Sequence, residues 1–336
     1  MHRHLLRLGR PPAYALGEYV RSGLEAVRLV GRISAAEGPF SAARPILDFA
    51  AGFGRTARFV RRDFGPGSVD AADVLPGSAA FNRDVLGLGA FDSTFDPALA
   101  RFPRRYGLIY VISLFTHLPA SRASAWIERL RSSLTDDGIL ILTTHGVGYG
   151  KREGLIPPES TAPYVFLPRS EIETLDASEY GTVYYDPAEF RELLAVAGCS
   201  GATTKERGLF GAHDVHIVSR DGRRIPPPPA APRGGFSRLS LHADGRFSGD
   251  AWVDVDPGGP GLAGVRTWLD GAPGPPLPFP GAVEAEDENG DRRLRYRVET
   301  SGRAAPFAPG ARVVGLTATE RDGARTLVAG EIVVPS

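Results

Sequence analysis

The sequence is poor in cysteine and in lysine. Cys199 is the only cysteine among 336 residues, which excludes an intramolecular disulfide and a metal site built from several cysteines. Lysine occurs only at Lys151 and Lys205, so arginine carries nearly all of the positive charge. The seven histidines do not form a metal-binding pattern either, because His2 and His4 are terminal and His213 and His216 fall on opposite faces of a predicted strand. We therefore predict no metal site.

Net charge and long apolar runs are also missing. The 39 basic and 39 acidic residues balance, so the chain lacks the electrostatic footprint of a protein that binds nucleic acid or an anionic membrane. Residues 1–10 are basic and contain leucines, but no apolar run long enough for a signal peptide or a membrane span follows. We expect a cytoplasmic protein without nucleic-acid or membrane partners, and the oligomeric state stays open.

A small-residue turn organises the first half of the chain. Residues 45–55 read Pro-Ile-Leu-Asp-Phe-Ala-Ala-Gly-Phe-Gly-Arg, which is typical of a buried strand that ends in a tight turn, and helical spacing follows over residues 56–64. Ala50, Gly52 and Gly54 place small residues at alternate positions, where a ligand must approach the backbone. A dinucleotide-type dehydrogenase is disfavoured, because its glycine spacing differs and its acid follows the turn.

The order of an acid followed by alternating small residues resembles the first motif of class I S-adenosylmethionine-dependent methyltransferases, acid-x-Gly-x-Gly-x-Gly. Asp48, Ala50, Gly52 and Gly54 fall on that pattern, with Ala50 in place of the first glycine. The resemblance covers about residues 14–220. It implies S-adenosyl-L-methionine as the cofactor, with these four residues in its binding site.

An acid at the end of the second predicted strand, residues 69–74, is the next candidate. Asp73 lies 25 residues after Asp48, where a carboxylate can accept hydrogen bonds from vicinal ribose hydroxyls. Asp70 competes for this role from mid-strand, and Asp73 could instead cap the helix expected over residues 77–86. A third strand is expected within residues 88–94, and the resemblance implies that Asp92, Ser93 and Thr94 at its end face an adenine ring.

The fourth and fifth predicted strands end in histidines. Residues 106–119 form an apolar strand with a polar tip ending His-Leu-Pro, similar to the fourth strand of the same methyltransferases, with Ser113 and His117 in the tip. A helix over residues 121–134 and a strand over residues 139–146, which contains His145, follow. Parallel strands bring their carboxyl ends to one edge, so we expect one shared site there. His117 and His145 are the candidate catalytic bases for a hydroxyl acceptor, and structural hydrogen bonds are the alternative role.

Residues 147–182 lack clear periodicity and are predicted to form a substrate lid lined by Tyr149, Tyr164, Phe166 and Tyr180. Asp186, Pro187 and Glu189 begin a helix that runs to residue 197 and stops at Gly198. Two terminal strands, about residues 202–209 and 213–219, resemble the hairpin that closes the class I methyltransferase sheet. An amphipathic helix over residues 14–33 precedes the first strand, and its Tyr19, Ser22 and Gly23 either close the site or pack against the sheet.

The chain changes character after a Pro-rich linker at residues 223–235. Six short strand candidates without helical periodicity predict a β-sandwich over residues 236–336. Its Trp252 and Trp268 could stack on sugar rings, but we expect them in the sandwich core. The predicted fold is thus an α/β, Rossmann-like methyltransferase sheet, parallel with a terminal antiparallel hairpin, over residues 1–222, followed by a small all-β sandwich.

The predicted function is methyl transfer from S-adenosyl-L-methionine to a small-molecule or saccharide acceptor, with a hydroxyl oxygen as the acceptor atom. Neutral charge and an aromatic lid favour such acceptors over DNA or RNA. The alternative is a catalytically inactive protein of the same fold that binds glycans through its sandwich.

Overall fold

The structure is a computed structural model that describes residues 12–169, 175–229, 231–242, 246–269, 272–279, 281–286, 292–303, 312–321 and 325–333. The chain divides into two compact units, Val30–Pro227 and Met1–Leu29 with Pro228–Ser336. The basic segment of residues 1–10 lies outside the described residues. Among the helices in the described ranges, none is long and apolar enough to cross a membrane.

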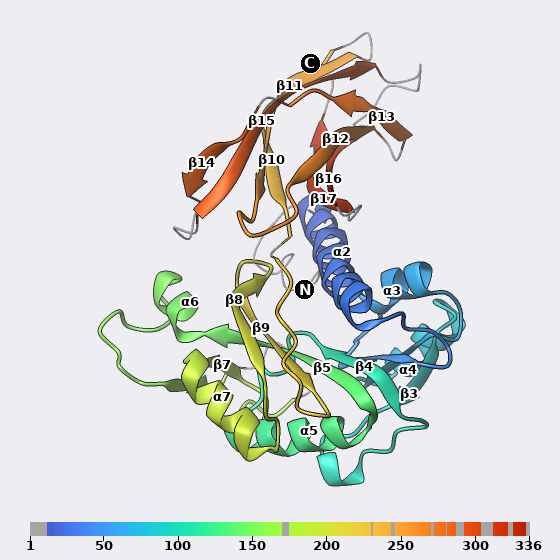
Figure 1. Ribbon diagram of the computed structural model, residues 1–336, viewed down its shortest axis with the longest axis vertical. Helices are drawn as coiled ribbons and strands as arrows, with labels where there is room; N and C mark the ends of the chain where they lie inside the picture. Colours follow the sequence, from blue (N-terminus) through green and yellow to red (C-terminus); the bar gives the residue numbers. More distant parts are fainter. Residues whose placement is uncertain are drawn as a thin grey trace. The chain divides into compact units, whose positions relative to one another are not determined.

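The unit of residues 30–227 is built on a nine-stranded mixed sheet (Figure 1). Its strands are β1 (Ile46–Phe49), β2 (Val69–Asp73), β3 (Gly89–Asp92), β4 (Tyr106–Val111), β5 (Leu134–Gly146), β6 (Tyr164–Leu167), β7 (Thr182–Tyr185), β8 (Thr203–Leu209) and β9 (His213–Ser219). Its helices are α3 (Ala57–Phe64), α4 (Ser78–Asp84), the short 3₁₀ helix η1 (Pro97–Leu99), α5 (Ala120–Ser132), α6 (Val147–Arg152), α7 (Pro187–Val196) and the end of α2 (Pro12–Glu37).

The strand order confirms the predicted fold class. Strands β3, β2, β1, β4 and β5 are parallel neighbours in that order. Strand β9 pairs antiparallel with β5, and β8 pairs antiparallel with β9, which forms the expected closing hairpin. The carboxyl ends of β1, β2, β4 and β5 therefore lie along one edge.

Alternate strand residues supply the core on one face of the sheet. Leu47 and Phe49 of β1 pack in one buried cluster with Trp126, Ile127 and Leu130 of α5. In Figure 1, α5 and α7 lie together on that face, and the two helices contact each other. Helix α7 begins as predicted, with the Asp186 side chain accepting a hydrogen bond from Ala188 N at 2.8 Å.

The segment of residues 147–182 is more ordered than the sequence predicts. It contains α6 and β6, and β6 pairs antiparallel with β7, which itself extends the sheet beside the end of β5. The expectation of a segment without regular elements is wrong, because a six-residue helix and a four-residue strand are too short to show a hydrophobic period. Residues 170–174 lie outside the described residues.

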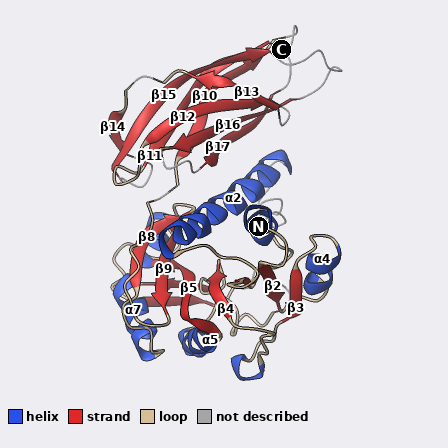
Figure 2. Cartoon of the chain, turned by 45° about the vertical axis from the view of Figure 1, so that its right-hand side comes forward, coloured by secondary structure: helices blue, strands red, loops and turns tan. Residues whose placement is uncertain are grey.

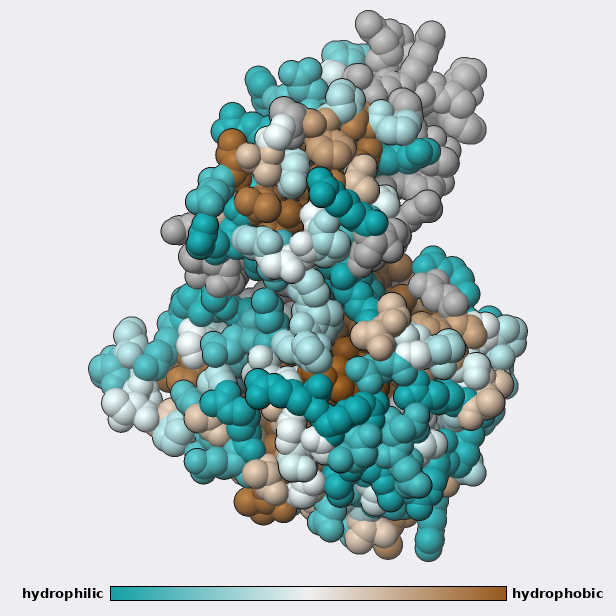
Figure 3. Space-filling model, viewed as in Figure 1, coloured by the Kyte–Doolittle hydropathy of each residue, from teal (hydrophilic) through white to brown (hydrophobic). Residues whose placement is uncertain are grey.

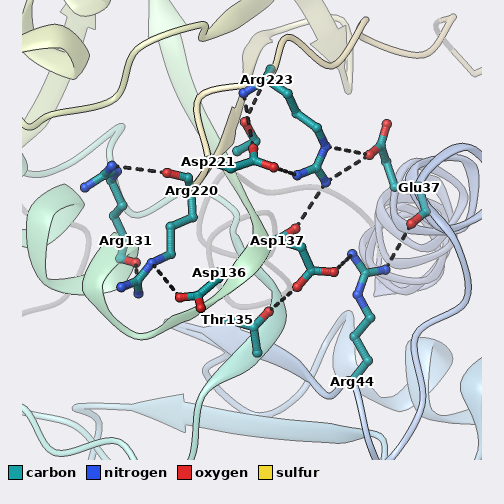
Figure 4. Close-up of polar contacts among 10 residues, drawn as sticks. Glu37, Arg44, Arg131, Thr135, Asp136, Asp137, Arg220, Asp221 and Arg223 are labelled. Carbon is teal, nitrogen blue, oxygen red and sulfur yellow. Dashed lines mark hydrogen bonds and ion pairs between the residues drawn. The ribbon is translucent and has the colours of Figure 1, made fainter.

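Charged side chains join the opposite, amino-terminal edge of the sheet to the end of α2 (Figure 4). Arg223 pairs with Glu37 at 3.0 Å, and Arg44 pairs with Asp137 at 3.1 Å. Arg44 also donates to the Glu37 carbonyl at 3.2 Å. These exposed or half-buried pairs contribute little individually, but they connect helix, strand and hairpin away from the candidate site.

Most of the surface of this unit that is visible in Figure 3 is hydrophilic, with hydrophobic residues in small groups. This agrees with the few large apolar side chains that are strongly exposed among the described residues, such as Phe53, Val85 and Val196. Isolated apolar residues of this kind are normal for a protein surface.

The second unit contains two four-stranded antiparallel sheets (Figure 2). One sheet has β10 (Arg233–Leu241), β11 (Arg246–Val255), β15 (Arg292–Arg303) and β14 (Val283–Glu286), and the other has β13 (Ala272–Leu277), β12 (Leu262–Leu269), β16 (Arg312–Glu320) and β17 (Arg325–Val333). Residues of both sheets share one core, which includes Val253, Val298, Val265 and Leu316. The predicted small β domain is confirmed, although β13 and β14 are additional to the six predicted strands.

The prediction that Trp252 lies in this core is wrong. Its neighbours Ala251 and Val253 point into the core, so Trp252 lies on the outer face of its sheet. There it packs over Gly235, and the Arg295 guanidinium carbon lies 4.8 Å from its ring centroid. The Trp268 side chain lies outside the described residues.

Candidate functional site

The glycine turn after β1 has the backbone conformation that its sequence suggests. Ala50, Gly52 and Gly54 all have positive φ values, of 62°, 54° and 68°. A Cβ on Gly54 would collide with the Asn82 amide and with Leu86 of the segment after β2, so glycine is required there. A Cβ on Gly52, in contrast, would meet no described atom within 4 Å. The turn is therefore closed at Gly54 and open at Gly52.

Asp73 lies against the open part of the turn. Its carboxylate accepts hydrogen bonds from Gly52 N at 2.6 Å and from Leu75 N at 2.8 Å. Burial raises the pKa of Asp73, and these backbone donors oppose the shift. Each carboxylate oxygen keeps a lone pair for a further donor.

The two alternatives considered for this position are wrong. The cap of α4 is Gly77, so Asp73 does not cap that helix. Asp70 does not take part in the turn, because it accepts two hydrogen bonds from Arg104 at 2.8 Å and one from the Tyr106 hydroxyl at 2.8 Å.

Asp48 is buried at the end of β1, beside Tyr110 of β4. Burial raises the pKa of Asp48 to about 7, and the Tyr110 hydroxyl and the Arg55 charge lower it in part. The Tyr110 hydroxyl faces this carboxyl without a hydrogen bond of normal geometry, and within the described part of the chain Asp48 Oδ2 has no partner. A buried acceptor without a donor is costly, so this oxygen is suited to a ligand that brings one.

The remaining predicted cofactor residues are at neighbouring strand ends. Asp92 is exposed at the end of β3, opposite Asp73 in register, and Ser93 N donates to the Asp73 carbonyl at 2.8 Å. Ser113 follows β4 with a φ of 70°, and its N–H donates to Thr143 Oγ1 at 2.9 Å. A positive φ at a serine is a strained conformation that its neighbours must hold.

His117 is oriented by the segment that the sequence predicts to be a lid. Its Nδ1 lies 2.7 Å from the Gly181 carbonyl, and its ring stacks on Tyr180 at 4.5 Å between centroids. Because a carbonyl can only accept, Nδ1 carries a proton, and in the neutral form of the ring the lone pair is on Nε2.

His145 lies in an aromatic environment with His213. Its ring centroid is 4.8 Å from that of His213 and 5.5 Å from those of Tyr149 and Tyr184. Burial lowers the pKa of His145 to about 3, and His117 contributes to this shift. His145 is therefore neutral at pH 7 and is a weak base. His145 Nδ1 is buried without a hydrogen-bond partner among the described residues.

Three residues that sequence reasoning gave no role also contact the site. Arg55, directly after the glycine turn, lowers the pKa values of both Asp48 and His213 through its charge. Asn82 Nδ2 donates to the Gly52 carbonyl at 2.9 Å and so holds the turn. The position of Arg55 inside the motif was an available signal, whereas the contacts of Asn82 and His213 join residues far apart in the sequence.

The predicted lid residues separate into two groups. Tyr149 and Tyr180 contact the site histidines. Tyr164 and Phe166 pack against the core cluster instead. Tyr19, Ser22 and Gly23 belong to the other unit of the chain, where the Ser22 hydroxyl donates to the Tyr19 carbonyl.

The site fits the cofactor that the sequence suggests. The open space at Gly52 lets a ligand approach the backbone of the turn. The Asp73 carboxylate beside it can accept hydrogen bonds from hydroxyl groups, and the Asp48 oxygen without a described partner can accept one from an ammonium group. In the described residues, no group of three or more His, Cys, Asp or Glu side chains is arranged to hold a metal ion.

Comparison with known proteins gives structural similarity only. No protein-family model and no curated protein matches the sequence. Among solved structures, a candidate O-methyltransferase from Nostoc punctiforme is 14% identical, with a TM-score of 0.42. The match covers 59% of this chain and 56% of the Nostoc protein. Magnesium protoporphyrin IX methyltransferase from Synechocystis, with bound SAH, is 19% identical, with a TM-score of 0.42 over 60% of this chain and 86% of its own. DesVI from Streptomyces venezuelae is 13% identical, with a TM-score of 0.44 over 67% of this chain and 99% of its own.

The chain's own topology defines the fold. A parallel sheet in the order β3, β2, β1, β4, β5, closed by the antiparallel β9 and β8, is the Rossmann-like arrangement that the sequence predicts.

Proposed function

We propose that the chain is an S-adenosyl-L-methionine-dependent methyltransferase that acts on a hydroxyl oxygen of a small-molecule or saccharide acceptor. The observation that carries this proposal is the glycine turn, which is open at Gly52 and has the Asp73 carboxylate and the lone Asp48 oxygen beside it. Asp73 would hold the ribose hydroxyls, Asp48 would accept from the ammonium group, and Asp92, Ser93 and Ser113 would line the adenine end.

The bound cofactor supplies a methyl group on a sulfonium, which is transferred by in-line displacement. The protein's task is to align the acceptor oxygen and to exclude water. We assign the proton to His117, because its Nδ1–H donates to the Gly181 carbonyl and this hydrogen bond orients the ring at the end of β4. His145 is too weak a base for this step, and we assign it a hydrogen-bonding role beside the acceptor.

The test is calorimetric titration of S-adenosylhomocysteine into the wild type, Asp73→Ala and Asp84→Ala, with NAD as the control ligand. Asp84 is an exposed carboxylate on α4 and serves as the matched control. We expect micromolar binding that Asp73→Ala weakens at least about tenfold, or about 1.4 kcal/mol, and that Asp84→Ala leaves unchanged. If the folded wild type gives no heat with S-adenosylhomocysteine, the proposal fails.

Glycan binding by the sandwich is the second candidate function. Trp252 favours it, because this ring lies on the outer face of a sheet, where an aromatic side chain can stack on a sugar. An oligosaccharide array probed with wild type and Trp252→Ala tests it, and equal binding of the two would exclude a role for this face.

A further inference from the structure

Two threonine hydroxyls hold Ser113 in its left-handed conformation, just after the end of β4. Its N–H donates to Thr143 Oγ1 of β5 at 2.9 Å, and its carbonyl accepts from Thr116 Oγ1 at 2.6 Å. Both threonines are fully buried. With a φ of 70°, Ser113 adopts a conformation that a serine keeps only where its surroundings impose it. The two hydroxyls therefore maintain a strained backbone at a predicted cofactor residue.

The two threonines differ in what holds them. Thr116 is three residues after Ser113 and belongs to the same turn, so it moves with Ser113. Thr143 lies within β5, which pairs with β4 on one side through residues 139–142 and with β9 on the other through residues 139–145. Its position is therefore set by the sheet and does not depend on the turn. Of the two, Thr143 is the fixed point from which Ser113 is positioned.

The same Thr143 hydroxyl oxygen lies 3.3 Å from His213 Nδ1 at the start of β9. A hydroxyl has one proton and two lone pairs, so after accepting from Ser113 N it can still donate its proton to Nδ1. Burial lowers the pKa of His213 well below its usual range, so the ring is neutral, and a neutral ring whose Nδ1 accepts has its proton on Nε2. His213 in turn packs against His145, with 4.8 Å between the ring centroids. One buried hydroxyl thus contacts both the predicted cofactor residue Ser113 and the group of histidines.

We infer that Thr143 is a positioning residue of the proposed site, whose hydroxyl fixes the backbone of Ser113 and the tautomer of His213 at the same time. This inference rests on the proposed function, which places Ser113 against the cofactor, and it adds a residue that acts through Ser113 without contacting the ligand. Without the hydroxyl, Ser113 loses a hydrogen bond that opposes its strain, and its backbone relaxes towards negative φ. The backbone beside the cofactor then moves, and the cofactor binds more weakly.

The experiment compares S-adenosylhomocysteine binding to wild type, Thr143→Val and Thr143→Ser by calorimetric titration. Valine keeps the shape of threonine without the hydroxyl, whereas serine keeps the hydroxyl. Thr144→Val is the matched control, because Thr144 is also buried on β5 but its side chain points to the opposite face, where its hydroxyl lies 2.9 Å from His216 Nε2. Urea denaturation of every variant is measured first.

Nitrogen-15 NMR of histidine-labelled protein reports the tautomer of His213, and a His213→Gln sample assigns its signals. We expect the Nε2–H tautomer in wild type, Thr143→Ser and Thr144→Val, and a mixture of the two tautomers in Thr143→Val. A general loss of stability would not change this one ring selectively.

We expect Thr143→Val to weaken S-adenosylhomocysteine binding at least about tenfold, while Thr143→Ser and Thr144→Val stay within about threefold of wild type. Unchanged affinity in Thr143→Val, an equal loss in Thr143→Ser or Thr144→Val, or a His213 tautomer that is Nδ1–H in wild type or unchanged in Thr143→Val would overturn the inference. If Thr143→Val does not fold, Thr143→Cys, which keeps only a weak hydrogen-bonding group, replaces it with the same expectations, and the wild-type tautomer decides independently. Failure of S-adenosylhomocysteine to bind wild type is a separate result that removes the proposed function itself.

Discussion

The proposed role of Asp48 requires an ionised carboxylate, but ionising this buried group lowers the stability of the fold. Burial raises its pKa from an ordinary value of 3.8 to about 7. Between these two values the folded protein holds a proton that the unfolded chain has released. The stability associated with this group is therefore fully present below about pH 4 and is lost as the pH rises towards 7.

We predict that Asp48→Asn is more stable than wild type at pH 8, whereas the two proteins differ less at pH 4. The pKa shift corresponds to a gain of about 4 kcal/mol at most, at about 1.36 kcal/mol for each pKa unit. The variant should bind S-adenosylhomocysteine more weakly, because it lacks the carboxylate for the ammonium group. Urea denaturation at both pH values and calorimetric titration measure the two effects. A variant that is less stable than wild type at pH 8 would contradict the prediction.

Wild-type affinity for S-adenosylhomocysteine should itself depend on pH. Asp48 must be ionised to pair with an ammonium group, and its pKa of about 7 means that it is mostly protonated at pH 6. We expect binding to weaken several-fold from pH 8 to pH 6, and Asp48→Asn to lose this dependence. Titrations in buffers of matched ionic strength test this, and an equal slope in both proteins would assign the pH effect to another group.

Ala50 occupies a left-handed conformation that alanine rarely adopts, with a φ of 62°. We predict that Ala50→Gly raises the free energy of unfolding by about 1 kcal/mol, because glycine adopts this conformation without strain. Ala51→Gly, one residue further along, is the control and should lower stability, since it removes a buried methyl group. Denaturation curves of the two variants compare them directly. If both variants lose stability equally, strain at Ala50 is not significant.

Sequence reasoning identified residues whose role is local and missed those that act across the fold. The position of each residue relative to a strand end is enough to predict Asp73 and the small residues of the turn as site residues. The structure brings Asp73 and Gly52 within hydrogen-bond distance. Asn82 contacts Gly52 from 30 positions away in the sequence, and Arg55 influences His213 of the closing hairpin. No periodicity encodes such contacts. The Asn82 contact depends on how α4 packs against the turn, and the contact with His213 depends on the pairing of β9 with β5.

At the scale of elements, the turn after β1 and helix α4 form one packed unit. Gly54 has a φ of 68° and leaves no room for a Cβ against the Asn82 amide and Leu86. We predict that Gly54→Ala lowers the free energy of unfolding by about 1–3 kcal/mol, as overpacking and strain combine, and abolishes S-adenosylhomocysteine binding. Gly52→Ala, which meets open space, should cost less stability yet still weaken binding, because its methyl group would lie where the ligand approaches.

This pair of variants separates folding from ligand contact. Thermal denaturation gives the stability order, and calorimetry gives the affinities. Equal stability losses in Gly54→Ala and Gly52→Ala would contradict the difference between the crowded position of Gly54 and the open position of Gly52. Unchanged affinity for S-adenosylhomocysteine in Gly52→Ala would show that the ligand does not bind against the turn.

Elements with an apolar run, a helical period or a capping residue were predicted well, and short elements without such a signal were not. The strands β1, β2, β4, β5, β8 and β9 and the helices α2, α5 and α7 show apolar spacing or capping residues in the sequence. Strands β6 and β14 have four residues each, and β13 reads Ala-Pro-Gly-Pro-Pro-Leu. Proline and glycine normally argue against a strand, and an edge position, which β13 occupies, is where a sheet tolerates them.

At the scale of the whole molecule, the first part of α2 belongs to the same compact unit as the β-sandwich, although more than 190 residues separate them in sequence. Arg28 of α2 donates two hydrogen bonds of 2.8 Å to the Glu320 carboxylate of β16 and one of 3.0 Å to the Pro229 carbonyl. Both charged side chains are almost fully buried, with exposed fractions of 4% and 3%. A buried guanidinium in this position needs its carboxylate, since either charge alone would remain without water.

We predict that Arg28→Ala lowers the free energy of unfolding by about 3–5 kcal/mol, because it removes the guanidinium that donates two hydrogen bonds to the buried Glu320 carboxylate. Glu18→Ala is the control on the same helix, since Glu18 pairs with Arg21 at a half-exposed position and Arg21 keeps Glu25 as a second partner, and it should cost less than about 1 kcal/mol. The double variant Arg28→Met with Glu320→Leu removes both charges and should recover most of the loss. Urea denaturation followed by circular dichroism measures all four proteins. If Arg28→Ala lies within about 1 kcal/mol of wild type, or the double variant is no more stable than Arg28→Ala, the ion pair does not hold α2 to the sandwich.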